Sequence, residues 1–375
     1  MSAPPDWPLG LARLAAALGR DLQRPARRAG GPLALWSARG AAFARALGLG
    51  GPELTAARRE RRGIDPAADR RALAAAGIHH AGMGEDAYPA ALYDLHDPPF
   101  GLFVRAADPS GVLARLVEGP AVAVVGSRRA TAAGLAFARE LGAGLAARGA
   151  VVVSGLAHGI DAAAHEGALR VGGVTVAVLG CGVDVPYPRR NRALAERVVT
   201  EGALVSEYWP GTPPAPWRFP ARNRIVAGLA GAVAVVEAGR RSGALITADF
   251  ALELGRPVLA VPGWPGTAAA EGGNGLLRAG AALLESADDV VAEMPHPGWA
   301  ADAPGAAAMV PGGLAGRVHA LLAHEPAVAD ALAAALGEDP AAVARALALL
   351  EVEGLVVRGE GQRWWAAPLA AGGRG

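Results

Sequence analysis

The chain has 375 residues, a formal net charge of +1 and a hydrophobic fraction of 52%, supplied mostly by alanine, valine and leucine. This length is enough for two or three domains, and the composition excludes a chain that is disordered throughout. All 36 basic residues are arginine. The absence of lysine excludes a P-loop lysine, a pyridoxal Schiff base and a lysine general base.

Cysteine usage and the start of the chain indicate the compartment. Cys181 is the single cysteine, which excludes an intrachain disulfide and a multi-cysteine metal site. The first ten residues lack the basic segment of a signal peptide, and Arg13 interrupts the nearest apolar stretch. No uncharged apolar run approaches the roughly 20 residues that a membrane span needs. We therefore expect a cytoplasmic protein without membrane contact.

Residues 1–75 are expected to form a small helical domain. Leu11, Leu14 and Leu18 fall on one helical face, and glycine and proline separate short helical patterns. Residues 58–62 hold four arginines, which we interpret as a solvated face rather than a binding site.

Residues 76–292 are expected to form the main domain. Pro98–Arg105 predicts an extended piece at the edge of a sheet, where proline is tolerated. Beyond it, six short apolar runs alternate with helical patterns, which predicts a doubly wound parallel sheet covered by helices on both faces. The predicted strands are Ala121–Val125, Val151–Val153, Val174–Leu179, Ala203–Ser206, Ala232–Glu237 and Val258–Val261.

The C-terminal part has a different pattern. Residues 293–312 are rich in proline, alanine and glycine and predict a linker. Residues 313–368 predict three helices followed by a β-hairpin around the turn Gly359–Gly361, the winged-helix arrangement. The expected third helix carries one basic residue, Arg345, and ends in acidic residues, a poor match to duplex phosphates. We therefore expect this domain to contact protein.

Arginines gather at the ends of the predicted strands, where parallel sheets bind ligands. Residues 120–292 hold 16 arginines and 14 carboxylates, but most carboxylates fall within helices. A focused positive rim favours a phosphodiester backbone, and the alternative is local ion pairs or helix caps. The rim consists of Arg128, Arg129, Arg189, Arg190, Arg192, Arg218, Arg222, Arg224, Arg240 and Arg241.

Two further patterns fit a nucleic acid. Ser127, Ser154 and Ser242 each lie in a glycine-containing turn that enters a helix, and such turns bind phosphate, although serine also caps helices generally. Residues 217–226 combine aromatic residues with arginine and asparagine, which stack on bases, bind phosphate and read base edges. The alternative for these arginines is an ion-pair network with Glu207 or Glu237.

Other site chemistries fit poorly. The turn after the first predicted strand lacks the second glycine of a dinucleotide fingerprint, and no acidic residue closes the second strand. His158, Asp161 and His165 suggest a metal, but no third ligand with suitable spacing accompanies Asp161 and His165, so we expect local capping and hydrogen bonding instead. No serine occupies a nucleophile elbow.

These motifs together resemble the bacterial DNA-processing protein A (DprA/Smf) family over about residues 85–290. The matching segments are Gly126–Arg128, Ser154–Asp161, Tyr187-Pro188, Ser206-Glu207, Phe219–Arg224, Ser242–Ala248, Val261–Gly263, Gly272–Asn274 and Gly280-Ala281. The resemblance implies an extended Rossmann-like core between a small helical, SAM-like domain and a winged-helix domain. Pocket positions that can be lysine elsewhere in the family must be arginine here or lost; arginine delivers the same charge, so we expect binding to survive.

The resemblance also implies a function. Members bind single-stranded DNA, form homodimers and load the recombinase RecA during natural transformation, without catalysis, cofactor or metal. The DNA contacts that we expect are Gly126, Ser127, Arg128, Ser154, Gly155, Arg189, Phe219, Arg222, Asn223, Arg224, Ser242, Gly243, Thr247 and Asn274. The competing hypothesis is a nucleotide-processing enzyme of the phosphoribohydrolase type, because Pro262–Thr267 with Glu271 partly matches the phosphate turn of those enzymes.

Overall fold

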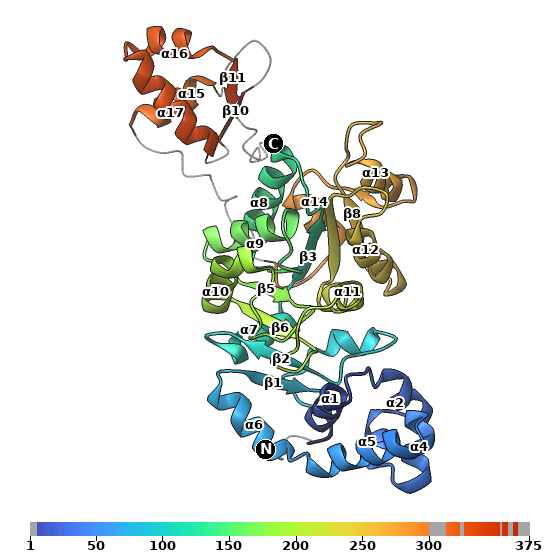
Figure 1. The fold of residues 1–375 in the computed structure, drawn as a ribbon. Helices are drawn as coiled ribbons and strands as arrows, with labels where there is room; N and C mark the ends of the chain where they lie inside the picture. The colour runs from blue at the N-terminus through green and yellow to red at the C-terminus, as the bar shows by residue number, and fades with distance from the viewer. Residues whose placement is uncertain (1–5, 300–312, 323–325, 353–354, 359–362, 367–375) are drawn as a thin grey trace. The chain divides into compact units, whose positions relative to one another are not determined.

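The computed structural model describes residues 6–299, 313–322, 326–352, 355–358 and 363–366 (Figure 1). The chain divides into two compact units, Met1–Ala300 and Ala301–Gly375. Among the described residues, no helix combines the length and the apolar character that crossing a membrane requires.

A nine-stranded sheet forms the centre of the first unit, in the order β1-β2-β6-β5-β4-β3-β7-β8-β9. The seven strands from β6 to β9 are parallel, whereas β2 is antiparallel to both β6 and β1. The six predicted strands are confirmed, each within one residue at either end. The strands are β1 (His79–Gly82), β2 (Gly101–Arg105), β3 (Ala121–Gly126), β4 (Val151–Ser154), β5 (Thr175–Val178), β6 (Ala203–Ser206), β7 (Ala232–Glu237), β8 (Val258–Ala260) and β9 (Ala282–Leu283).

Helices cover both faces of the sheet, as the continuous apolar strands predict. In β3, Val122 and Val124 belong to one buried core, and Ala123 and Val125 belong to the other, because successive side chains point to opposite faces. Helices α8, α9 and α14 close the first core, and α7, α11 and α12 close the second. The helices are α7 (Pro109–Glu118), α8 (Ala132–Ala147), α9 (Ile160–Arg170), α10 (Arg192–Glu201), α11 (Arg218–Leu229), α12 (Gly243–Glu253), α13 (Glu271–Arg278) and α14 (Ala287–Glu293), with short 3₁₀ turns η1 (Ala90–Asp94) and η2 (Arg189–Asn191).

The placement of Pro98–Arg105 at a sheet edge is wrong. Strand β2 pairs with β1 on one side and with β6 on the other. Pro98 and Pro99 precede the strand, so neither removes a donor from its ladder, and β1 takes the edge position instead.

The N-terminal helices pack around their own core within the first unit. Leu11, Leu14 and Leu35 are fully buried there. The four arginines of residues 58–62 are not equivalent, because Arg61 lies 4.7 Å from the ring centroid of Phe43 and donates a 2.6 Å hydrogen bond to the Ala38 carbonyl. The helices are α1 (Asp6–Leu18), α2 (Gln23–Ala29), α3 (Pro32–Ser37), α4 (Gly40–Leu47), α5 (Gly51–Gly63) and α6 (Pro66–Ala75).

The second unit contains the predicted three helices and antiparallel hairpin, and the winged-helix prediction is confirmed. Gly337, at φ 65°, ends the second helix in the left-handed conformation that glycine adopts freely. The elements are α15 (Leu314–Leu322), α16 (Ala329–Leu336), α17 (Pro340–Val352), β10 (Val356–Arg358) and β11 (Trp364–Ala366). The predicted turn at Gly359–Gly361 and residues 300–312 of the predicted linker lie outside the described residues.

Candidate nucleic-acid interface

The sheet has a topological switch point between β3 and β7. The chain moves outward from β3 through β4 and β5 to β6, and then returns to place β7 on the other side of β3. In open α/β sheets, ligands bind outside the carboxyl ends of the strands at such a switch point, which directs attention to the loops after β3 and β7. The two loops are joined where the Ser127 N–H donates a 2.6 Å hydrogen bond to the Glu237 carbonyl.

The turn after β3 exposes two arginines. The Ser127 hydroxyl accepts a 3.1 Å hydrogen bond from the Arg129 N–H, which fixes the turn. The Glu237 carboxylate accepts a 2.8 Å hydrogen bond from the Thr131 hydroxyl at the start of α8. The predicted alternative of Glu237 as an ion-pair partner for an arginine is therefore not what the structure shows. Arg128 and Arg129 extend into solvent.

The turn after β4 packs directly against the turn after β3. The buried Asp161 carboxylate accepts hydrogen bonds from the N–H groups of Gly155 and Ala157, at 3.1 and 3.3 Å. Gly159 has φ 83°, and a Cβ there would collide with the Ser127 carbonyl oxygen. Glycine is required at this position because it permits both the backbone conformation and the close approach of the two turns.

His165 and Asp161 are explained by local hydrogen bonds. His165 Nδ1 lies 2.6 Å from the Thr175 hydroxyl, and burial lowers the pKa of His165 to about 3. Burial also raises the pKa of Asp161, although nearby Arg222 opposes that shift. Within the described ranges, no group of three histidine, cysteine, aspartate or glutamate side chains is arranged to hold a metal.

An exposed stack of arginine and aromatic rings crosses this edge of the sheet. The Arg128 guanidinium carbon lies 5.7 Å from the ring centroid of Phe219. Phe219 in turn stacks on Tyr187, with ring centroids 5.3 Å apart and an interplanar angle of 28°. Tyr187 is 41% exposed, and Arg189 and Arg190 follow it on the surface. We call Arg128, Tyr187, Arg189, Arg190 and Phe219 the arginine–aromatic surface.

His158 lies in the electrostatic field of this surface. Its pKa is lowered first by burial and then by the positive charges of Arg190 and Arg128, while a hydrogen bond with Asn191 acts in the opposite direction. Asn191 also fixes the turn after β4, because its side-chain amide donates a 2.9 Å hydrogen bond to the Leu156 carbonyl.

Arg224, which we expected to contact DNA, is buried. Only 4% of the residue is exposed, and its two terminal nitrogens lie 2.8 and 2.6 Å from the Glu207 carboxylate oxygens. Asp97 accepts from its Nε at 3.2 Å. The alternative ion-pair interpretation with Glu207 therefore describes Arg224, and we remove this residue from the direct DNA contacts.

Arg222 is likewise 4% exposed and serves as an internal brace. Its guanidinium donates to the carbonyls of Val178 and Gly155, the latter at 3.0 Å, at the ends of β5 and β4. Burial lowers its pKa, and the neighbouring Asp161 carboxylate opposes that shift. Arg222 thus holds the ends of β4 and β5 from the interior of the protein, and we remove it from the direct DNA contacts too.

Of four other expected contacts, Ser154, Asn223 and Asn274 form hydrogen bonds that hold neighbouring backbone, and Thr247 is buried in α12. The Ser154 hydroxyl is fully buried and donates a 2.6 Å hydrogen bond to the Val124 carbonyl. Thr247 is buried, and the Asn223 amide donates to the Gly243 carbonyl at 3.0 Å. The side-chain amide oxygen of Asn274 accepts a hydrogen bond from the Gly263 N–H, and its NH₂ group donates one to the Gly263 carbonyl. The expected residues that remain at or near the surface are Gly126, Ser127, Arg128, Gly155, Arg189, Phe219, Ser242 and Gly243, together with the partly exposed Asn223 and Asn274.

Tyr187 and Arg190 belong to the arginine–aromatic surface and His158 lies beside it, but none of the three was among the expected contacts. Tyr187 stands two positions before a pair of arginines, the same association of an aromatic ring with arginine that singled out residues 217–226. That pattern was available in the sequence. The contact between Tyr187 and Phe219 was not, because 32 positions separate them.

Comparison with known proteins places the chain in a family. Residues 79–295 match the family model described as DNA recombination-mediator protein A, and residues 301–362 match that of the DprA winged-helix domain. A DprA relative in Mycobacterium tuberculosis is 49% identical over 248 residues, which are 65% of this chain. The chain spans 64% of the length of that relative.

Solved structures show the same relationship. The structure of DNA processing protein A from Streptococcus pneumoniae is 34% identical with a TM-score of 0.66, covering 78% of this chain and 99% of that one. A structure of DNA processing protein A from Helicobacter pylori, which concerns its single-stranded DNA binding mode, is 29% identical with a TM-score of 0.51. The match covers 57% of this chain and 94% of the Helicobacter pylori chain. The chain belongs to the DNA recombination-mediator protein A (DprA) family.

Proposed function

We propose that the protein binds single-stranded DNA in the cytoplasm through the arginine–aromatic surface, protects the strand and loads the recombinase RecA onto it during natural transformation and homologous recombination. Family membership supports this proposal, as does the single-stranded DNA binding of the Helicobacter pylori relative. The protein acts as a binding and loading factor, not as an enzyme.

The stack of Arg128, Phe219 and Tyr187 at the switch point is the observation that carries the proposal. Aromatic rings next to arginines suit a single strand, since bases stack on the rings while guanidinium groups contact phosphates. In duplex DNA the bases are already stacked on one another, so the rings would have no free base to hold.

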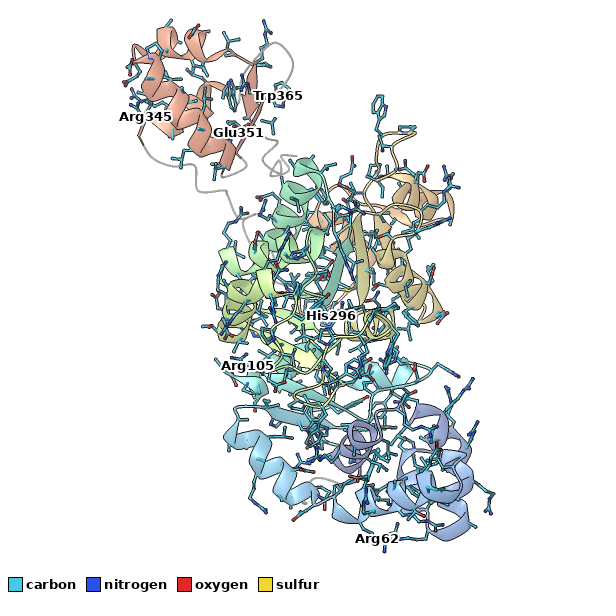
Figure 2. All side chains as sticks on the ribbon, in the orientation of Figure 1. Arg62, Arg105, His296, Arg345, Glu351 and Trp365 are labelled. Carbon is cyan, nitrogen blue, oxygen red and sulfur yellow. The ribbon has the colours of Figure 1, made fainter. Side chains whose placement is uncertain are left out.

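The surface of α17 in the winged-helix domain suits binding to a protein partner better than binding in a DNA groove. The outward residues of α17 include Leu349 and Val352, the latter 87% exposed, and the basic residue of the helix is Arg345. Figure 2 labels Arg345 and Glu351 on this helix and Trp365 on the hairpin. An apolar helix face with little charge offers few contacts to phosphates and suits a protein surface.

A homodimer is part of the proposal. A mediator that holds two stretches of one strand gains affinity, because the second binding event becomes intramolecular. Sedimentation at micromolar concentration is expected to give a dimer, and a monomer under these conditions contradicts this part.

Fluorescence anisotropy tests the proposal directly. The wild-type chain is titrated with labelled dT20 and with a 20-base-pair duplex, each at 50 and 200 mM salt. We expect preference for dT20 and a loss of affinity with salt of about 0.7 logarithmic units per decade for each phosphate contact. Equal affinity for the duplex, or no dependence on salt, contradicts the proposal. Sustained turnover of a nucleoside monophosphate by the purified protein supports the enzyme hypothesis instead.

A further inference from the structure

Trp264 is a large aromatic ring that the fold leaves in solvent. It lies in the turn after β8 and is 81% exposed. An isolated exposed apolar residue needs no explanation by itself. A binding role for Trp264 therefore has to be argued from the rigidity of its turn and from the residues in the neighbouring turn.

The turn that carries Trp264 is fixed by hydrogen bonds at both ends. Asn274 accepts from the Gly263 N–H at 3.0 Å and donates to the Gly263 carbonyl at 2.9 Å. The Thr267 hydroxyl and N–H donate to the Trp264 carbonyl at 2.7 and 3.2 Å. The backbone is thus ordered before any ligand arrives, so less entropy is lost when the ring binds one.

Exposed arginines lie on the neighbouring strand end. Strand β8 pairs with β7, and the turn after β7 presents Arg240 and Arg241. A hollow of about 940 Å³ is lined by Arg240, by Gly263 and Thr267 of the Trp264 turn, and by residues of α12 and α13 that include Asp249 and Glu271. Arg240 forms an exposed ion pair with Glu271 at 3.3 Å, and Arg241 beside it is also exposed. An exposed ring and exposed arginines therefore occupy the turns of two neighbouring strands.

We propose that Trp264 is a second base-stacking platform for the same DNA strand, which runs along the carboxyl edge of the sheet from Tyr187 past Arg128 and Arg241. This inference rests on the proposed function. From β5 to β8 the sheet order is β5-β4-β3-β7-β8, so the track covers four strand spacings, about 19 Å. At the 3.4 Å spacing of stacked bases this is about six nucleotides, and a more extended strand covers it with fewer.

A length series of oligo(dT) tests the track. Wild-type affinity is expected to rise steeply between dT4 and dT12, when the strand becomes long enough to reach Trp264. Trp264→Ala is expected to flatten this rise and to weaken dT12 binding by about 5- to 150-fold, the range for one stacked base. Trp264→Phe is expected to restore most of the rise. Leu252→Ala, which trims another exposed apolar side chain at the opposite end of α12, is the matched control.

The same series with Arg128→Ala separates the two proposals. Arg128→Ala is expected to weaken binding at every length. If Arg128→Ala weakens binding and Trp264→Ala behaves as wild type, the Trp264 platform is overturned and the proposed function stands. If neither variant changes affinity, the proposed function itself fails. If Trp264→Ala converts a dimer to a monomer in sedimentation while each protomer keeps its affinity at all lengths, the turn is a self-association surface and the platform is overturned.

Discussion

Arginines of the turn after β3 and arginines of α11 lie near the same edge of the sheet, but their surroundings differ. Arg128 extends into solvent over the Phe219 ring, whereas Arg222 and Arg224 are 4% exposed and bound by carbonyls and carboxylates. A buried charge must be paired and hydrogen-bonded, and carbonyl and carboxylate acceptors accordingly surround these guanidinium groups. The exposed arginines keep their donors for a ligand.

An arginine in such a motif can shape a binding surface without itself being exposed on it. Arg222 holds the ends of β4 and β5 in place, and those ends lead into turns beside the proposed DNA surface. Its role is to position the surface, and loss of function in a variant of Arg222 would not by itself show a phosphate contact.

Arg224→Ala gives the largest expected effect and tests whether the buried arginines of α11 stabilise the fold. Removing the guanidinium leaves the partly buried Glu207 carboxylate without its partner, which is expected to lower the free energy of unfolding by about 3 kcal/mol. Urea unfolding followed by circular dichroism measures the change. Arg105→Ala removes a partly exposed ion pair with Glu196 and serves as the control, with an expected loss of at most about 1 kcal/mol. Equal losses in both variants would contradict the assignment.

Arg128→Ala is expected to reverse this pattern, with an unchanged unfolding free energy and weaker DNA binding. Loss of one phosphate contact lowers the magnitude of the slope of log affinity against log salt concentration by about 0.7. It lowers the affinity at 0.1 M salt by about fivefold. Anisotropy titrations with dT20 at several salt concentrations measure both quantities. Arg139→Ala, on the outer part of α8 and paired with Glu166, is the control with no expected change. An unchanged salt dependence for Arg128→Ala would remove this residue from the surface.

The smallest expected effect concerns pH. Burial and the charges of Arg190 and Arg128 lower the pKa of His158 below its usual 6.5, so the ring is neutral at pH 7. A bound phosphate favours the charged ring and raises its pKa, so binding takes up a proton, and affinity rises as the pH falls from the raised pKa of the bound state toward the lowered pKa of the free protein. Comparing dT20 affinity at pH 5.5 and pH 8 measures the effect. His158→Asn is expected to reduce this change in affinity with pH. An equal change in the wild-type protein and the variant would show that a group other than His158 takes up the proton.

Sequence patterns predicted the central strands well and the surroundings of side chains poorly. The apolar runs of β3 and β7 were found within one residue because both faces of these strands are buried, which requires apolar residues at every position. The edge assignment of Pro98–Arg105 failed because the sequence does not show that β1 pairs outside β2. Ser154 has the pattern of a phosphate turn, but its hydroxyl is used by the Val124 carbonyl of the adjacent strand.

The sequence by itself determined the order of elements, the family and the concentration of arginine at the strand ends, because these depend on local pattern and on motifs read along the chain. Only the tertiary structure decided which arginines are free for a ligand and which brace the fold. That distinction depends on partners far away in sequence, such as Glu207 for Arg224, Gly155 and Val178 for Arg222, and Tyr187 for Phe219. Burial and the acceptors within reach, rather than residue type, set the role of each charge.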